Sequence, residues 1–488
     1  MLRRLALVSF IALVGAAAAA QDALPPTVLQ ALREAGVPPE SFAAVALPLT
    51  HAARPWRHRV EVPMAPASTM KLVTSIVALD RLGTSFRGST ELRSAAPLVG
   101  GMLQGDLVLN GGADPDLGVP QFWALLLELR QQGISTIAGD LLIDRTLFRP
   151  PRMDLGVPPF DETPEFAYND IPDAVQLAGN LLTLDLSSTA DTLRVQPLPA
   201  LPGLDITSRM TLLATPCDGW EDGWKPATVQ RAGERTSIEL QGSYPANCTQ
   251  RIELQVIDRV ELAERLMRTL WQGLGGTWAG HARDAATPAD ARLLARRESR
   301  PWGELLHGMN KQSDNVLARL LFLQLGVPQM AAAPQATTAE LAAREVRLWL
   351  AERHIDARGL VLDNGSGLSR SERITPLQLA SMLKVAHASP WAPDLLMSLP
   401  VAGVDGTART RLTNSPAAGW ARLKGGTLRN VVSLAGYVRD PQGRTWAVAM
   451  MVNHDNASRA RGALFAWVDS FAREGPQRLQ RQRQAKAR

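Results

Sequence analysis

The sequence has few cysteines and histidines, and after its first 20 residues it has no long apolar run. Two cysteines are too few for a zinc site of thiolates, and the seven histidines include no His-Glu-x-x-His pattern, so the sequence does not indicate a metal hydrolase. A transmembrane helix needs roughly 20 consecutive apolar residues, and no later stretch reaches that length. The glycine-rich run at 273–276 follows a predicted helix rather than a strand, which does not fit a dinucleotide-binding loop. We therefore expect no metal, no cofactor and, beyond residue 20, no membrane span.

Positive charge gathers at the two ends of the chain. Removing Arg3, Arg4 and the five cations of residues 475–488 from the formal charge of +5 leaves −2 for the rest. A body with so little net charge does not predict binding to nucleic acid. Residues 475–488 contain no acid and few apolar side chains, so we expect a basic disordered tail there.

The first 20 residues have the pattern of a secretory signal peptide. Two arginines precede an apolar stretch of about ten residues, and small residues lead up to a cleavage point after Ala20. We therefore expect signal cleavage and a periplasmic protein. Disulfides persist outside the cytoplasm, and the even cysteine count predicts that Cys217 and Cys248 are bridged.

Apolar periodicity separates a helix-rich body from a β-like middle region. Short β-type segments alternate with turns between residues 87 and 257, whereas helical periodicity returns after 258. Near the C-terminus, strand-like runs at 431–439 and 445–453 flank a turn and predict a hairpin, followed by a helix at 457–473. We expect an α/β (α+β) fold, an antiparallel sheet flanked by helices. Residues 21–86 and 258–474 would form this domain, interrupted by a β-rich insert at 87–257.

The segment Ser68-x-x-Lys71 opens a predicted helix that Gly83 ends. A spacing of three places both side chains on one helix face, where the amine can reach the hydroxyl. An amine whose pKa is lowered by burial or nearby positive charge can take the serine proton and activate the nucleophile. A serine at a helix start also has an unpaired backbone N–H that can stabilise an oxyanion. The same spacing recurs at Ser381-x-x-Lys384, but Thr375 and a following proline predict that this serine lies in mid-helix with its N–H bonded.

Lysine is scarce in this chain. Only six lysines occur against 46 arginines, so a position that needs only positive charge is usually Arg. If basic residues were drawn blindly, two chosen positions would both be Lys about 1% of the time, and only Lys can lose its proton. We therefore interpret Lys71 and Lys424 as lysines selected for their chemistry.

Two more motifs follow in the order of an active-serine signature. Ser313-Asp314-Asn315 falls between two predicted helices, and Lys424-Gly-Gly-Thr427 precedes the predicted hairpin. With these motifs the sequence resembles the class C low-molecular-mass penicillin-binding proteins, the D-alanyl-D-alanine carboxypeptidase/endopeptidase family. Segments 66–74, 105–115, 311–315 and 365–370 carry the resemblance, together with the 244 residues between the first serine and the second, where this family inserts extra domains.

The resemblance implies a transpeptidase/β-lactamase-like domain and a role for each motif residue. It makes Ser68 the acylated nucleophile, with Lys71 as its base, and Ser313 the relay that carries the proton to the leaving D-alanine. The oxyanion would be held by the backbone N–H groups of Ser68 and Thr427. Peptidoglycan peptides and β-lactams would be the ligands. The remaining implied site residues are Asn315, which holds the peptide amide, Lys424, which binds the terminal carboxylate, and Gly426 with Thr427, which line the substrate strand.

The third motif departs from the family pattern. The family has Lys-Thr-Gly or Lys-Ser-Gly, whereas Gly425 lacks the hydroxyl that helps to hold the substrate carboxylate. Losing a hydrogen bond to a charged group weakens binding by roughly 1.5 to 3 kcal/mol and leaves the nucleophile in place. Two alternatives remain open at this point: a serine β-lactamase, and a catalytically weak homologue that binds peptidoglycan.

Overall fold

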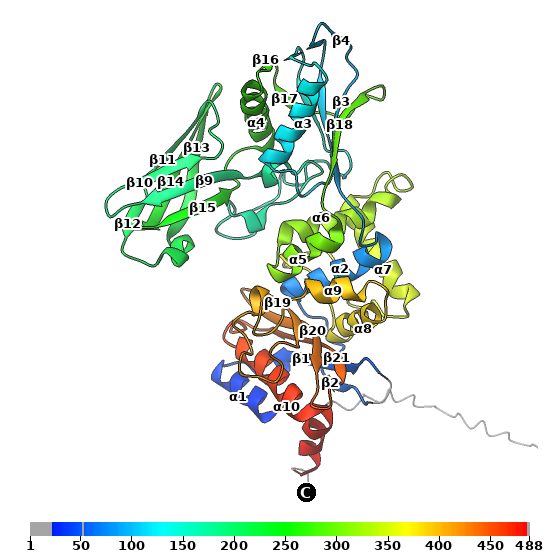
Figure 1. Cartoon of the computed structure of the whole chain (residues 1–488). Coiled ribbons are helices and arrows are strands. Elements are labelled where there is room, and N and C mark those ends of the chain that lie inside the picture. The colour runs from blue at the N-terminus through cyan, green and yellow to red at the C-terminus, as the bar shows by residue number, and fades with distance from the viewer. Residues whose placement is uncertain (1–21, 51–52, 486–488) are drawn as a thin grey trace, which may run out of the picture.

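The computed structural model describes residues 22–50 and 53–485, with side chains described up to residue 476. Figure 1 shows two parts: the ends of the chain build the lower part and the middle of the chain builds the upper part. The predicted signal peptide at 1–20 lies outside the described residues. Among the helices that are described, none is long and apolar enough to cross a membrane.

The lower part is built on a five-stranded antiparallel sheet. Strand β1 (Phe42–Pro48) near the N-terminus pairs with β21 (Thr445–Asn453) near the C-terminus, and β2 (Trp56–His58), β20 (Val431–Arg439) and β19 (Arg422–Leu428) complete it. All seven residues of β1 are buried, as in a strand that is covered on both faces. The predicted hairpin at 431–453 and the antiparallel sheet flanked by helices are thus confirmed.

Helices cover both faces of this sheet. One apolar core lies between the sheet and α2 (Met70–Arg81), α5 (Trp302–Lys311), α6 (Asn315–Gly326), α7 (Thr338–Glu352), α8 (Pro376–His387) and α9 (Ala392–Ser398). A second core lies between the opposite face and α1 (Pro26–Glu34) and α10 (Arg461–Ala485). The edge strand β19 lies beside the start of α2, which brings two of the three sequence motifs together.

The upper part contains the predicted β-rich insert. One sheet has the order β17 (Ala282–Asp284), β8 (Leu141–Asp144), β6 (Leu107–Gly112), β3 (Ser89–Ser94) and β18 (Arg292–Glu298), and α3 (Val119–Gln131) and α4 (Arg259–Gly273) pack beside it. A small sheet joins β16 (Thr277–Trp278), β7 (Thr136–Ile137), β5 (Met102–Leu103) and β4 (Leu98–Val99). The expected insert boundary at 257 is therefore too early, because α4 and β16–β18 share the core of the insert and extend it to residue 298. Helical periodicity does not reveal which core a helix will join.

The rest of the insert is a separate group of antiparallel and parallel strands. One sheet contains β9 (Leu182–Ser188), β10 (Leu193–Pro197) and β15 (Thr249–Leu254); the other contains β11 (Leu204–Ser208), β12 (Thr211–Leu213), β13 (Trp224–Ala232) and β14 (Arg235–Pro245). Cys217 and Cys248 form the predicted disulfide, with their Cα atoms 5.4 Å apart. The bridge ties the turn before β13 to the start of β15.

The C-terminal segment differs from the expectation of disorder. Helix α10 breaks at Gly475, which has a φ of 72°, and helical structure then continues to Ala485. Glutamine, arginine, leucine and alanine dominate this segment and all have high helix propensity, a preference that its low hydrophobicity does not remove.

Candidate active site

Ser68 lies in a single helical turn (Ala67–Thr69) directly before α2. The turn is unusual because Ala67 has a φ of 46°, and Gly367 packs against it so closely that a Cβ there would overlap the Ala67 carbonyl. Gly367, with a φ of 85°, can adopt this conformation without strain. The segment 365–370, one of those that carry the family resemblance, thus packs against the backbone of Ala67 and Ser68 through Gly367.

Lys71 is fully buried one turn after Ser68. Its Nζ lies 3.1 Å from Ser68 Oγ and donates to Asn315 Oδ1 and to the Ser366 carbonyl, both at 2.6 Å. Burial, reinforced by the positive charge of Lys424, holds the pKa of Lys71 well below its ordinary value. A neutral amine has two N–H groups and one lone pair. In that form the two short bonds would use both N–H groups and leave the lone pair for the serine hydroxyl.

Lys424 and Ser313 form a second lysine–serine pair on the other side of the site. The fully buried Lys424 Nζ donates to Ser313 Oγ at 2.8 Å and to the Gly425 carbonyl at 2.9 Å. Burial lowers the pKa of Lys424 to about 7. Ser313 has a φ of 65°, a left-handed conformation at the break between α5 and α6 that turns its side chain toward β19.

Asn315 connects the two chain segments that meet at the site. Its Oδ1 accepts from Lys71, and its Nδ2 donates to the Tyr168 carbonyl at 2.9 Å. Tyr168 belongs to the insert, and sequence reasoning did not identify it. Because both ends of the amide have fixed partners, the orientation of the Asn315 side chain is set by the insert as well as by α6.

The two glycines of the third motif have opposite surroundings. A Cβ at Gly426 would lie 2.8 Å from both the Pro66 carbonyl oxygen and the Ser68 nitrogen, so only glycine lets β19 approach the nucleophile this closely. A Cβ at Gly425 would meet nothing within 4 Å, and its φ is not in the left-handed range. The exposed Thr427 lines the cleft in front of Ser68, and its Oγ1 accepts from Arg461 Nη2 at 3.0 Å.

Comparisons with known proteins agree with this geometry. The sequence profile of the D-Ala-D-Ala carboxypeptidase 3 (S13) family matches residues 28–470. The chain is 31% identical over 392 residues to the D-alanyl-D-alanine carboxypeptidase of Actinomadura sp. (strain R39), covering 78% of this chain and 72% of that protein. It is 27% identical over 398 residues to the D-alanyl-D-alanine carboxypeptidase DacB of Haemophilus influenzae, covering 80% of each.

The chain belongs to the D-Ala-D-Ala carboxypeptidase 3 (S13) family. The crystal structure of penicillin binding protein 4 (dacB) from Haemophilus influenzae has the same fold, with a TM-score of 0.74 and 24% identity over 91% of this chain and 98% of that one. A structure of that protein complexed with a β-lactam matches with a TM-score of 0.70. The predicted family, fold and enzyme class, a serine D-Ala-D-Ala carboxypeptidase, are confirmed.

The second Ser-x-x-Lys segment of this S13 enzyme lies where the sequence predicted. Ser381 is in the middle of α8, which Thr375 begins with a capping box and Pro376 continues. The helix contributes to the core under the sheet and does not line the cleft in front of Ser68. The segment therefore has helical spacing without the site's surroundings.

The cleft of the S13 enzyme has a volume of about 380 Å³ and one wall from the insert. Ser68, Ser313 and Asn315 lie at its base, and insert residues 160–162 and Tyr168 form that wall. Glu162 on the insert and Arg429 on the β19–β20 turn are joined across the cleft by an exposed ion pair of 2.6 Å. A larger cavity of about 610 Å³ shares Phe160 and Arg370 with the cleft. The Arg370 guanidinium lies 4.3 Å from the centroid of the Phe160 ring.

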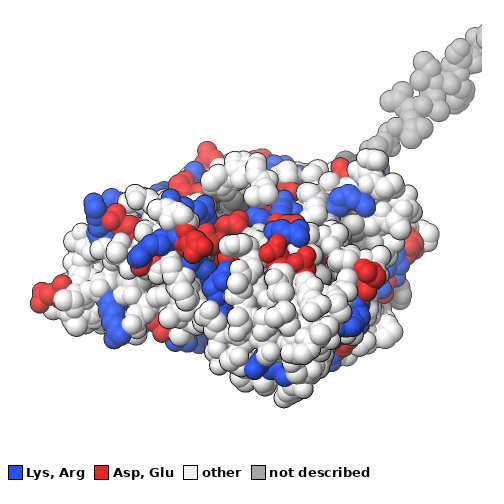
Figure 2. Space-filling model, turned by 90° about the horizontal axis from the view of Figure 1, so that it is seen from above, with Lys and Arg blue, Asp and Glu red and all other residues white. Residues whose placement is uncertain are grey.

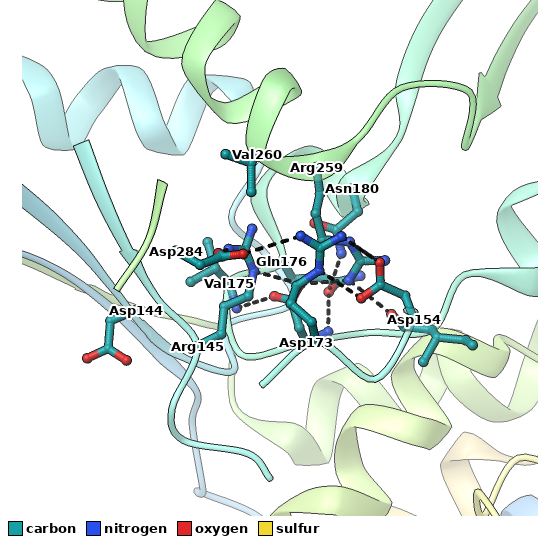
Figure 3. A network of polar contacts seen from close by, with 12 residues as sticks. Asp144, Arg145, Asp154, Asp173, Val175, Gln176, Asn180, Arg259, Val260 and Asp284 are labelled. Carbon is teal, nitrogen blue, oxygen red and sulfur yellow. Dashed lines mark hydrogen bonds and ion pairs between the residues drawn. The ribbon is translucent and has the colours of Figure 1, made fainter. Parts of the chain in front are cut away.

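A buried network of ion pairs holds this wall of the S13 enzyme together within the insert, and hydrogen bonds from α6 join it to the body. Arg259, at the start of α4, pairs with Asp173 at 2.6 Å, Asp170 at 3.3 Å and Asp154 at 3.4 Å, and Figure 3 shows it between Asp154 and Asp173. On α6, Arg319 donates to the Asn169 carbonyl at 3.1 Å. Burial outweighs these cations and raises the pKa of Asp170 to about 6. The network thus holds the segment that carries Tyr168 against α6.

Acidic and basic side chains are mixed on the face seen in Figure 2, and no large area there has one sign. This face therefore offers no continuous basic surface. The mixture agrees with the small net charge of the body of the chain.

Proposed function

We propose that this protein is a periplasmic serine-type D-Ala-D-Ala carboxypeptidase and endopeptidase that acts on peptidoglycan stem peptides and cross-links through an acyl-enzyme on Ser68. The observation that carries the proposal is the buried Lys71 amine 3.1 Å from Ser68 Oγ, with both of its N–H groups already bonded. Burial and the nearby Lys424 lower the pKa of this amine well below its ordinary value, because protonating it would place a charge away from water, and this favours its role as the base.

The reaction then follows from the positions of these groups. Ser68 Oγ attacks the carbonyl of the penultimate D-alanine as its proton moves to Lys71, and the backbone N–H groups of Ser68 and Thr427 stabilise the oxyanion. The C–N bond breaks, and the leaving amine takes that same proton from Lys71 through Ser313, whose hydroxyl oxygen accepts a hydrogen bond from Lys424 at 2.8 Å. Water then attacks the ester carbonyl as its proton moves to Lys71, the C–O bond to Ser68 breaks, and Lys71 returns the proton to Ser68 Oγ as the shortened peptide leaves.

Both activities are proposed for one site because the leaving group differs only in size. A carboxypeptidase expels free D-alanine, whereas an endopeptidase expels an amine that belongs to a second stem peptide. The cleft is open to solvent, and its upper wall is formed by exposed side chains such as Tyr168 and Glu162. A bulky leaving group therefore has space beside the wall formed by the insert.

Labelling with a fluorescent penicillin tests the proposal. We expect stable labelling for hours, peptide mapping that places the label on Ser68, and loss of the label in Ser68→Ala. Turnover of the label within seconds would indicate a β-lactamase, and absence of any label would indicate a protein that only binds peptidoglycan. Digestion of purified muropeptides should release D-alanine from monomers and convert cross-linked dimers to monomers; unchanged dimers would refute the endopeptidase part. N-terminal sequencing of protein from a periplasmic extract should begin at Gln21.

A further inference from the structure

Arg461 is a cation that bonds to Thr427, a residue that lines the cleft, and no sequence motif includes it. It is the first residue of α10 and is half-buried, and its Nη2 lies 3.0 Å from Thr427 Oγ1. Among the side chains that the structure describes, no carboxylate pairs with it. The nearby Arg429 differs, because Glu162 already neutralises it. Arg461 is thus a cleft-side cation whose charge remains uncompensated.

The direction of the bond between Arg461 and Thr427 can be assigned without seeing hydrogens. A guanidinium has only N–H groups and cannot accept, so Thr427 Oγ1 must be the acceptor. The hydroxyl hydrogen of Thr427 is then free to point toward another acceptor. Because Thr427 lines the cleft beside Ser68, a group of a bound ligand can be that acceptor.

Other features leave the carboxylate end of this cleft short of donors and charge. Gly425, next to Lys424, has no side chain that could donate to a ligand. The Lys424 amine is committed to Ser313 and to the Gly425 carbonyl, and its burial lowers its pKa to about 7, so much of it is neutral near that pH. An arginine stays protonated under all these conditions.

We propose that Arg461 is a positioning residue for the substrate's terminal carboxylate: it turns the Thr427 hydroxyl toward that carboxylate and supplies a permanent positive charge behind it. The inference rests on the proposed function, in which the ligand of the Ser68 site ends in a carboxylate. It assigns to α10, the last helix of the chain, a part in substrate selection.

The test compares two ligands that differ only in this charge, benzylpenicillin and its neutral methyl ester. Acylation rates are measured for the wild type, Arg461→Ala, Arg461→Gln and Arg461→Lys. We expect the neutral variants to acylate about tenfold more slowly with benzylpenicillin, the lysine variant to be intermediate, and all four proteins to react equally with the ester. Arg459→Ala is the matched control. Arg459 is an exposed arginine two residues away, and its replacement removes the same charge.

Each result decides the inference. An equal loss with both ligands would mean that Arg461 supports the structure of the site in general, and no loss with either would mean that it does not sense the carboxylate; both overturn the proposal. If wild-type protein is not acylated by either ligand, the proposed function fails first and the inference falls with it. Melting temperatures show whether each variant is folded. If the alanine variant does not fold, Arg461→Gln still tests the inference, because glutamine keeps most of the packing of the arginine side chain.

A double-mutant cycle isolates the orienting role. Thr427→Val removes the hydroxyl and keeps the shape, and it should slow acylation by benzylpenicillin. If Arg461 acts by turning that hydroxyl, the double variant should be little slower than either single variant. Losses that multiply would overturn the orienting role. The KM for a D-alanyl-D-alanine peptide should rise in the same pattern with kcat changing less, which a general structural defect would not produce.

Discussion

Replacing Gly425 by threonine should restore the hydroxyl that this chain lacks. The structure removes the main objection to this change, because the φ of Gly425 is not left-handed and a Cβ there would meet nothing within 4 Å. The new hydroxyl would lie on β19 next to Lys424. The gain should be smaller than the full value of a hydrogen bond to a charged group, because Thr427 already offers a hydroxyl to the same carboxylate. With a net gain of about 1.4 kcal/mol, KM for a D-alanyl-D-alanine peptide should fall by about tenfold.

The same substitution should stabilise the fold slightly. Glycine in a strand costs roughly 0.5–1 kcal/mol relative to alanine, and threonine is a good strand residue, so Tm should rise by about 1–3 °C. The assays are steady-state release of D-alanine and thermal unfolding of the same preparations. The adjacent glycine provides a control with the opposite outcome: Gly426→Ala should abolish acylation, since its Cβ would enter the space between Pro66 and Ser68.

Two results would refute this reasoning. An unchanged KM with an unchanged Tm would mean that position 425 does not face the carboxylate and that the third motif is aligned wrongly. A lower Tm in Gly425→Thr would mean that the strand does not tolerate a side chain there, although the space around it is open.

The remaining predictions use other parts of the same structure. Lys71→Arg should keep the fold but abolish penicillin labelling, because arginine cannot accept the serine proton; labelling at the wild-type rate would place the base elsewhere. Ser381→Ala should leave labelling unchanged, as measured by in-gel fluorescence. Replacing Cys217 and Cys248 by serine should lower the unfolding free energy of the insert by roughly 3 to 4 kcal/mol. In calorimetry the insert should then unfold in a separate transition at a lower temperature than the rest of the protein. Asp170, whose raised pKa of about 6 favours its protonated form in the folded state, should contribute stability below about pH 4 that is lost as the pH rises through 6; urea unfolding of Asp170→Asn should lack this slope, and equal slopes would contradict it.

Much of the fold could be predicted from local sequence patterns. Apolar patterns located the C-terminal hairpin and the two helices on either side of Ser313, because the apolar residues of these elements recur at helical spacing or form continuous strand-like runs. The cap formed by Thr375 and Pro376 likewise predicted that Ser381 lies in mid-helix. Local patterns failed at the insert boundary, since the amphipathic face of α4 is the same whichever core it packs against.

The site shows the same division between sequence and tertiary structure. By itself the sequence predicted which side chains do chemistry: Ser68 with Lys71, Ser313 with Asn315, and Lys424, because these motifs depend on short spacings and on residue types that only certain reactions need. The structure places these side chains within hydrogen-bonding distance of one another in two groups. Only the tertiary structure decided what surrounds them. The Tyr168 carbonyl that orients Asn315 is a backbone group, which any residue could supply, and it comes from 147 positions away.

The same holds for Arg461, one of 46 arginines, which no local pattern distinguishes from the others. It is placed beside Thr427 only because α10 packs across the sheet that ends in β19. A motif records the groups that a reaction requires at close spacing. The groups that orient them depend on how distant segments of the chain pack together. Short sequence patterns do not reveal that packing.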